Sequence, residues 1–255
     1  IGQWPNILMG YFEFNKQRVF YQIVGEGKPL VLQHGYMQWG DDWHYAGWVK
    51  HFSKNHKLII IDSIGHGRSS NSEKIEDYSI ENGVELIIKL MDFLNIENFN
   101  FFGFSMGGRI AFQLLSDYSD RIDKIIIGGM HPNPPIKYRK QINFQEDAHI
   151  ISEKTKLVKH PRPSYNINAL KLCDNAQIKW KGIESELNRI NNQILLFAGD
   201  MDPYFDWIID AAKKLKNSHF INLKGVGHVG SFYRINRSIN FIINFLEEKR
   251  GDYGK

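Results

Sequence analysis

The pentapeptide Gly103-Phe104-Ser105-Met106-Gly107 decides how the rest of this chain is interpreted. It reads G-x-S-x-G and joins an apolar run, residues 99–104, to a helical pattern over residues 106–118. Glycines two positions before and after a serine permit a turn that is too tight for bulkier residues. A serine at such a strand-to-helix turn is a frequent enzymatic nucleophile. We therefore predict a nucleophilic serine, and the surrounding sequence has to support that prediction.

Length and composition fit one large α/β domain with a sizeable core. The chain has 255 residues, of which 42% are hydrophobic and 24% are charged. No apolar run approaches the roughly 18 residues that a membrane span needs, and we expect no signal peptide before the first strand pattern. The net charge of +4 is too small to indicate nucleic acid as a partner. We therefore expect a small-molecule substrate, no nucleic acid and no membrane span, and we leave the oligomeric state open.

Two local features of the composition bear on location and substrate. Cys173 is the only cysteine, so no intramolecular disulfide can form, and the chain fits a reducing, cytoplasmic compartment. We expect Cys173 to be a buried bystander rather than a reactive thiol. Residues 137–181 carry ten Lys or Arg against four Asp or Glu, a net charge of +6. This basic segment is either a solvated surface or a field that steers anionic substrates.

Short apolar runs alternate with amphipathic helical patterns, which predicts a mostly parallel, doubly wound sheet. The first two runs flank Asn15-Lys16-Gln17 and predict a hairpin. Eight runs are interpreted as strands: residues 12–14, 19–24, 30–33, 58–62, 99–104, 124–129, 193–198 and 219–223. Five helices are expected over residues 42–52, 80–94, 106–118, 205–215 and 231–248.

The alternation stops between residues 131 and 190, where no clear strand occurs and prolines cluster. A structureless loop of this length is uncommon inside a compact domain. We therefore predict a mainly helical insertion over residues 131–190, with a core domain formed by residues 1–130 and 191–255.

The predicted nucleophile needs a base within hydrogen-bond reach and an acid that orients the base. For this type of turn the expected chain order is serine, acid, histidine. Asp202 and His228 follow Ser105 in that order, each just after a predicted strand, where ligands of such sheets bind. Asp200 competes for the acid role. We favour Asp202, which lies further over the sheet edge, and expect Asp200 to stabilise a turn.

An acyl-transfer site also needs donors for the oxyanion that forms during reaction. We expect one donor to be the backbone N–H of Met106 at the helix start. The second is expected from the loop after the strand at residues 30–33, as the N–H of Tyr36. Four side chains are predicted to line the substrate pocket, although plain core packing explains each aromatic residue equally well: His34, Trp39, Phe104 and Tyr204. We expect His34 to shape the loop by hydrogen bonding rather than to react.

Five stretches together resemble the α/β-hydrolase superfamily over nearly the whole chain. The resemblance implies the corresponding fold, with an eight-stranded, mostly parallel sheet flanked by helices. It also implies that residues 131–190 form a small cap over the active site. The stretches are HGYMQWG (34–40), DSIGHGRSS (62–70), GFSMGGRIA (103–111), GDMDP (199–203) and GVGH (225–228).

The resemblance assigns roles to single residues as well. It implies that Asp202, which precedes a proline, is the acid, and that Asp62, His66 and Arg68 belong to a structural loop. Many relatives carry an acidic residue five positions after the catalytic histidine, where this chain has Tyr233. That departure leaves the subfamily open.

The leading hypothesis is a serine hydrolase that cleaves an ester of a small, partly apolar substrate. Its Ser105 would form an acyl-enzyme, and the chemistry needs neither a metal nor a cofactor. By resemblance, a serine at this position disfavours haloalkane dehalogenase and epoxide hydrolase activity, which use aspartate there. Two alternatives stay open: carbon–carbon bond hydrolysis or lysis of an anionic substrate, and a slow-turnover ligand receptor that retains the three residues.

Overall fold

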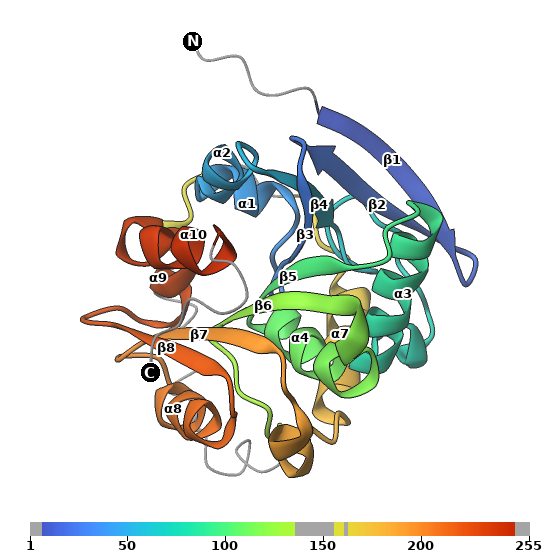
Figure 1. Cartoon of the computed structure of the whole chain (residues 1–255). Coiled ribbons are helices and arrows are strands. Elements are labelled where there is room, and N and C mark those ends of the chain that lie inside the picture. The colour runs from blue at the N-terminus through green and yellow to red at the C-terminus, as the bar shows by residue number, and fades with distance from the viewer. Residues whose placement is uncertain (1–6, 136–155, 161–162, 248–255) are drawn as a thin grey trace.

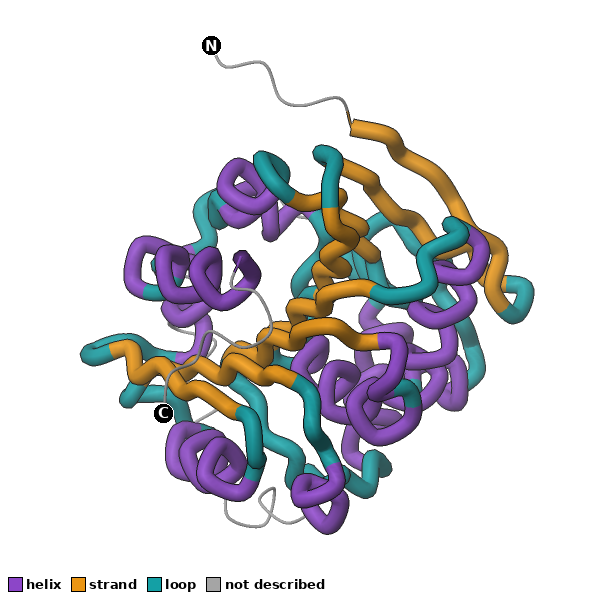
Figure 2. Tube along the Cα trace, in the orientation of Figure 1, coloured by secondary structure: helices purple, strands orange, loops and turns teal. Residues whose placement is uncertain are grey.

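The computed structural model describes residues 7–135, 156–160 and 163–247. Eight strands form one sheet in the order β1-β2-β4-β3-β5-β6-β7-β8, with helices on both faces (Figures 1 and 2). The pairs β1–β2 and β2–β4 are antiparallel and all others are parallel. The strands are β1 (Ile7–Phe14), β2 (Gln17–Val24), β3 (Lys28–Gln33), β4 (His56–Ile61), β5 (Phe99–Phe104), β6 (Ile122–Gly128), β7 (Gln193–Gly199) and β8 (Ser218–Leu223). The predicted fold is therefore confirmed.

The predicted hairpin is also present, with a two-residue turn between β1 and β2. Asn15 and Lys16 have φ angles of 49° and 65°, so both adopt the left-handed conformation. Two such residues in succession match the right-handed twist of the paired strands. The first strand begins at Ile7, earlier than its sequence pattern indicates, because it pairs along its whole length with β2.

Helices of both chain halves cover each face of the sheet. One face packs against α1, α2, α9 and α10 and the other against α3, α4, α7 and α8. The α-helices are α1 (Asp41–Tyr45), α2 (Trp48–Phe52), α3 (Ile80–Phe93), α4 (Met106–Asp117), α7 (Ile167–Ile178), α8 (Phe205–Lys214), α9 (His228–Tyr233) and α10 (Ile239–Glu247). Short 3-10 turns are η1 (Ile75–Tyr78), η2 (Ser119–Arg121), η3 (Glu184–Arg189) and η4 (Ile235–Arg237). None of the helices described is both long and apolar enough to cross a bilayer.

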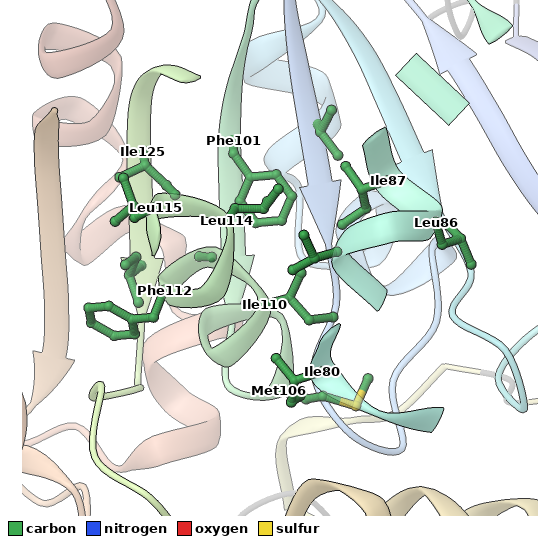
Figure 3. Close-up of a cluster of buried hydrophobic side chains, with 14 of the residues drawn as sticks. Ile80, Leu86, Ile87, Phe101, Met106, Ile110, Phe112, Leu114, Leu115 and Ile125 are labelled. Atoms are coloured by element: carbon green, nitrogen blue, oxygen red, sulfur yellow. The ribbon is translucent and has the colours of Figure 1, made fainter. Parts of the chain in front are cut away.

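Strand β5 lies at the centre of both cores because its six residues are all buried. Phe101 points to the face where α3 and α4 pack, as Figure 3 shows with Ile87 and Ile110. Phe102 points to the opposite face, where it lies edge-on to Trp43 at 4.8 Å between ring centroids. Burial on both faces is expected for a parallel strand, and it fixes the strand that leads into Ser105.

Two of the predicted helices are wrong in extent. The helix predicted over residues 42–52 is broken at Gly47, whose φ of 95° no helical residue can adopt. The helix predicted over residues 231–248 begins earlier, at His228, and is interrupted by η4. Near this interruption the carbonyl of Phe232 accepts a hydrogen bond from the indole N–H of Trp48 at 3.0 Å. The carbonyl of Phe232, next to the end of α9, is thus hydrogen-bonded to a side chain of α2.

The predicted insertion is described only in part. Helix α7 and the turn η3 are helical, as expected for this segment. Residues 136–155 and 161–162 lie outside the described residues. The division into core and cap therefore stays a prediction.

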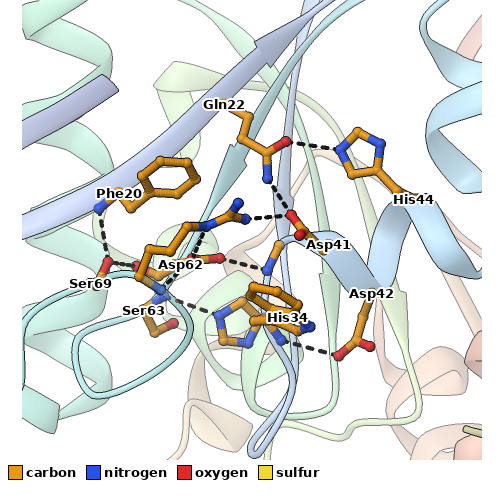
Figure 4. Close-up of polar contacts among 12 residues, drawn as sticks. Phe20, Gln22, His34, Asp41, Asp42, His44, Asp62, Ser63 and Ser69 are labelled. Carbon is orange, nitrogen blue, oxygen red and sulfur yellow. Dashed lines mark hydrogen bonds and ion pairs between the residues drawn. The ribbon is translucent and has the colours of Figure 1, made fainter. Parts of the chain in front are cut away.

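A polar network holds the loop after β4 against the start of α1 (Figure 4). Asp62 is fully buried and accepts hydrogen bonds from the backbone N–H groups of Gly40 at 2.6 Å and Arg68 at 2.8 Å. The Arg68 guanidinium contacts Asp62 and Asp41 and lies 4.0 Å above the ring of Phe20. These contacts agree with the structural role that the resemblance implies for this loop.

The electrostatics of Asp62 follow from its position. Burial raises the pKa of its carboxyl, while the N–H groups and the positive charge of Arg68 oppose that shift. The carboxylate is nevertheless surrounded by donors, which is how a buried charge is tolerated. The result is a rigid link between residues 62–68 and the segment that follows β3.

The central core position of Phe102 gives a stability prediction. Phe102→Ala should lower the free energy of unfolding by about 3–5 kcal/mol, because a fully buried ring is lost and a cavity remains. Phe241→Ala serves as the matched control, since Phe241 is 60% exposed, and should change stability by no more than about 0.5 kcal/mol. Urea denaturation measures both variants. Equal losses would contradict the assignment of the core.

Candidate active site

Ser105 occupies a strained turn between β5 and α4. Its φ of 54° and ψ of −112° lie outside the regions that a serine ordinarily adopts. A Cβ at Gly103 would lie 2.0 Å from the carbonyl oxygen of Gly107, and one at Gly107 would lie 2.2 Å from that of Gln33. Only glycine fits at both positions. The turn projects the Ser105 side chain beyond the carboxyl end of the sheet.

Asp202 and His228 come from two neighbouring loops that are joined by backbone hydrogen bonds. The N–H of Met201 donates to the carbonyl of Val226 at 3.0 Å. A Cβ on Gly199 would lie 1.8 Å from that same carbonyl oxygen, so the two loops can only approach this closely at a glycine. Asp200 accepts from the N–H of Gly225 at 2.7 Å and so stabilises the turn.

The three side chains meet in one chain of hydrogen bonds. His228 Nδ1 lies 2.7 Å from Asp202 Oδ2, and His228 Nε2 lies 3.0 Å from Ser105 Oγ. An ionised carboxylate can only accept, so Nδ1 carries the proton and Nε2 accepts from the serine hydroxyl. Asp202 and His228 are buried, whereas Ser105 is partly exposed. This arrangement can remove a proton from Ser105 and hold it on a correctly oriented imidazole.

Aromatic rings enclose the imidazole of His228. Phe104 lies beside it at 5.3 Å between centroids, and Tyr204 stands perpendicular to it at 5.5 Å. The backbone N–H of Tyr204 also donates to the second oxygen of Asp202, at 2.9 Å. Both oxygens of the acid are therefore engaged, one by the base and one by the backbone of the turn.

The loop after β3 approaches Ser105 closely. A Cβ on Gly35 would lie 3.0 Å from the Cβ of Ser105. The N–H of Gly35 donates to Gln38 Oε1 at 2.9 Å, and the N–H of Met37 donates to His66 Nε2 at 3.2 Å. The N–H groups of Gly35 and Met37, on either side of Tyr36, are therefore already hydrogen-bonded within the protein. The assignment of the Tyr36 and Met106 N–H groups to an oxyanion hole stays a prediction.

The four predicted pocket residues differ in their surroundings. His34 is fully buried, bonds to the backbone oxygen of Gly35 and accepts from the N–H of Ser63 at 3.0 Å, so it bridges two loops as expected. Trp39 is partly buried, with the Arg68 guanidinium 4.9 Å from its ring. Phe104 and Tyr204 lie beside His228, as described above. Their role in binding substrate stays a prediction.

His131 lies near the site and was not predicted. It follows the end of β6, and its ring contacts Tyr204 at 5.4 Å and Trp207 at 5.1 Å between centroids. Burial, assisted by the positive charge of Arg109, lowers the pKa of His131 to about 3, and Glu184 opposes the shift. The rule that site residues follow strand ends would have identified His131.

Cys173 is buried on α7, as expected, with its Sγ 3.7 Å from the sulfur of Met106. Burial raises the pKa of its thiol to about 12. The thiolate is the reactive form of cysteine, so this raised pKa disfavours reaction at Cys173. The expectation of an unreactive bystander is in keeping with these surroundings.

Comparison with known proteins supports the same family. A family model described as alpha/beta hydrolase fold matches residues 28–147. The chain is similar to a putative non-heme chloroperoxidase of Synechocystis, 26% identical over 95% of this chain and 100% of that protein. Two further relatives align over only 35% and 36% of their own length.

Solved structures agree in fold. A hydrolase from Pseudomonas aeruginosa superposes with a TM-score of 0.78, at 17% identity, over 94% of this chain and 98% of that one. An enol-lactonase from Burkholderia xenovorans superposes with a TM-score of 0.76, at 20% identity, over 94% of this chain and 100% of that one. At such identities the likeness establishes the fold alone.

The lowered pKa of His131 predicts how stability depends on pH. A buried neutral histidine contributes stability that is present above its ordinary pKa of 6.5 and is lost as pH falls toward 3. His131→Asn should remove this dependence, so its unfolding free energy should fall less steeply, by up to about 1.4 kcal/mol per pH unit. Denaturant unfolding between pH 7 and pH 4 measures the slopes. Parallel curves for the two proteins would contradict the prediction.

Proposed function

The chain belongs to the α/β-hydrolase superfamily, and we propose that it is a serine hydrolase that cleaves carboxylic esters through an acyl-enzyme on Ser105. One observation carries the proposal: Ser105, His228 and Asp202 are joined by hydrogen bonds of 3.0 and 2.7 Å at the carboxyl end of the sheet. A buried acid that orients a histidine toward a partly exposed serine hydroxyl is an arrangement for nucleophilic acyl transfer.

In the first half-reaction Ser105 Oγ attacks the ester carbonyl while its proton moves to His228 Nε2. The imidazolium that forms is stabilised by Asp202, whose Oδ2 accepts the hydrogen bond from Nδ1 at an N···O distance of 2.7 Å. The carbonyl oxygen becomes negatively charged, and the N–H groups of Met106 and Tyr36 are the proposed donors to it. The tetrahedral intermediate collapses when His228 returns the proton to the departing alcohol, which leaves an acyl group on Ser105.

The second half-reaction repeats these steps with water. His228 Nε2 takes a proton from the water, the hydroxide attacks the acyl carbonyl, and the same amides hold the oxyanion. Ser105 leaves as the alkoxide and recovers its proton from His228. Every proton moves between groups of the site and the substrate, so no metal or cofactor is needed.

The rings beside His228 suggest the kind of substrate. The rings of Phe104 and Tyr204 lie beside the imidazole of His228, so apolar surface is next to the reacting histidine. Such a surface suits a small ester with an apolar acyl or aryl group. One relative of similar length is named a putative non-heme chloroperoxidase. An acyl-enzyme can transfer its acyl group to hydrogen peroxide instead of water and give a peracid, so hydrogen peroxide is a second acyl acceptor to test.

The proposal predicts covalent labelling and turnover at one serine. Wild-type protein should react with a fluorophosphonate at Ser105 and should hydrolyse short-chain p-nitrophenyl esters. Ser105→Ala should lose the label and lower kcat by on the order of 10⁶-fold, since no nucleophile remains. Intact mass and peptide mapping locate the label. Unchanged ester turnover in Ser105→Ala would refute the proposal.

Two aspartates of the same loop offer a matched test of the acid. Asp202→Asn should lower kcat by about 10⁴-fold, because the amide cannot stabilise the imidazolium and disturbs its tautomer. Asp200→Asn removes a charge from the same turn, where, among the contacts described, the Asp200 carboxylate bonds to the N–H of Gly225 and to Lys224. Its kcat should stay within about twofold of wild type. The reverse ranking of the two variants would show that Asp200 is the acid.

A panel of substrates, with simple esters and anionic vinylogous diketones, also distinguishes ester hydrolysis from the two alternative functions. Hydrolysis of simple esters supports the proposal. Activity confined to anionic vinylogous diketones would assign carbon–carbon bond hydrolysis to the same residues. Ligand-induced stabilisation with a turnover far below the enzyme median of about 10 per second would indicate a receptor.

A further inference from the structure

The insertion and the loop after β3 are joined by two reciprocal hydrogen bonds. The hydroxyl of Tyr36, in that loop, donates to the carbonyl of Leu170 on α7 at 3.0 Å. The hydroxyl of Tyr165, just before α7, donates to the carbonyl of Met37 in the loop at 2.8 Å. Each segment therefore supplies one tyrosine hydroxyl and one backbone oxygen to the other.

A third contact ties the same two parts of the chain. His160 Nε2 lies 2.9 Å from Oδ1 of the fully buried Asp42, in the helix that follows the loop. The His160 ring stacks on Tyr45 with centroids 4.0 Å apart and planes 10° apart. The insertion thus contacts both ends of the segment that runs from Tyr36 to Tyr45.

The loop is held both from the core and from the insertion at the position where the oxyanion donor is expected. It is irregular backbone, and Met37 has a φ of 56°, which a non-glycine residue rarely adopts. The core holds the peptide that carries the Tyr36 N–H through its carbonyl, that of Gly35, which accepts from the N–H of Gln38 at 3.1 Å and lies 2.8 Å from His34 Nδ1. The insertion holds the two residues that follow this peptide bond, Tyr36 through its hydroxyl and Met37 through its carbonyl.

We propose that Tyr36, through its hydroxyl, and Tyr165 are positioning residues that hold the oxyanion donor in place by fastening the loop to the insertion. The inference rests on the proposed function, because it assigns the Tyr36 N–H to the oxyanion. Neither hydroxyl touches substrate in this account. A displacement of the amide on the order of 1 Å weakens its bond to the transition state more than any contact with the ground-state ester.

The test compares tyrosine-to-phenylalanine variants of the full chain with a matched control. Tyr165→Phe and Tyr36→Phe each remove one hydroxyl and keep the ring. Gln113→Met removes the acceptor of another bond between insertion and core, from the indole N–H of Trp180 at 2.7 Å, which ends on α4 and not on the loop. The two classes of variant thus loosen the insertion at different places.

Both phenylalanine variants should lower kcat for a p-nitrophenyl ester by about 10-fold to 100-fold, with KM within about twofold of wild type. Inhibition by a boronic acid, which forms a tetrahedral adduct on the serine, should weaken by the same factor as kcat/KM. Gln113→Met should keep kcat and boronate affinity within about twofold, although its melting temperature also falls.

The outcomes separate this inference from the function on which it rests. Wild type that neither hydrolyses esters nor binds the boronate overturns both. An active wild type with phenylalanine variants that match Gln113→Met in kcat, KM and boronate affinity overturns the positioning role alone. A loss that appears in KM instead of kcat also overturns it, because the hydroxyls would then serve ground-state binding. If one variant fails to fold, the other decides.

Discussion

The strained turn at Ser105 is the constraint on which the rest of the structure depends. A positive φ at a non-glycine residue costs on the order of 1–3 kcal/mol and persists only where the surroundings enforce it. Here the enforcement comes from both sides, because β5 is buried on its two faces and α4 is packed against α3 and the sheet. Gly103 and Gly107 have no side chain, so the backbone of the strand and the backbone of the helix can come into direct contact at these positions. The fold therefore fixes the serine before any other site residue is considered.

The loops around this turn are held by backbone contacts and by a buried carboxylate paired with an arginine. The loops of Asp202 and His228 are joined through the Met201–Val226 hydrogen bond and the close approach of Gly199. On the opposite side of Ser105, Asp62 and Arg68 hold the segment after β3. Among the residues described, the loop at Tyr36 is also fastened to the insertion, by the hydroxyls of Tyr36 and Tyr165.

The sequence allowed the sheet and the three central side chains to be predicted because both follow from local patterns. Buried parallel strands are short apolar runs, and Ser105, Asp202 and His228 each follow one of them. The ends of the helices were harder to predict from the sequence. The break at Gly47 and the interruption after Tyr233 lie on either side of a tertiary contact, the bond from Trp48 to Phe232, that no local pattern indicates. The bonds of Tyr36 and Tyr165 join residues far apart in sequence without any spacing signal, so only the structure places them together.

The most direct test of the central claim is a crystal structure of the protein after reaction with a fluorophosphonate. The account predicts a covalent bond from Ser105 Oγ to phosphorus, with one phosphonyl oxygen within about 2.7–3.1 Å of the backbone nitrogens of Met106 and Tyr36. His228 Nε2 should remain within hydrogen-bond reach of Ser105 Oγ. A phosphonate attached to another residue, or one whose oxygen faces solvent while both amides point elsewhere, would contradict the account.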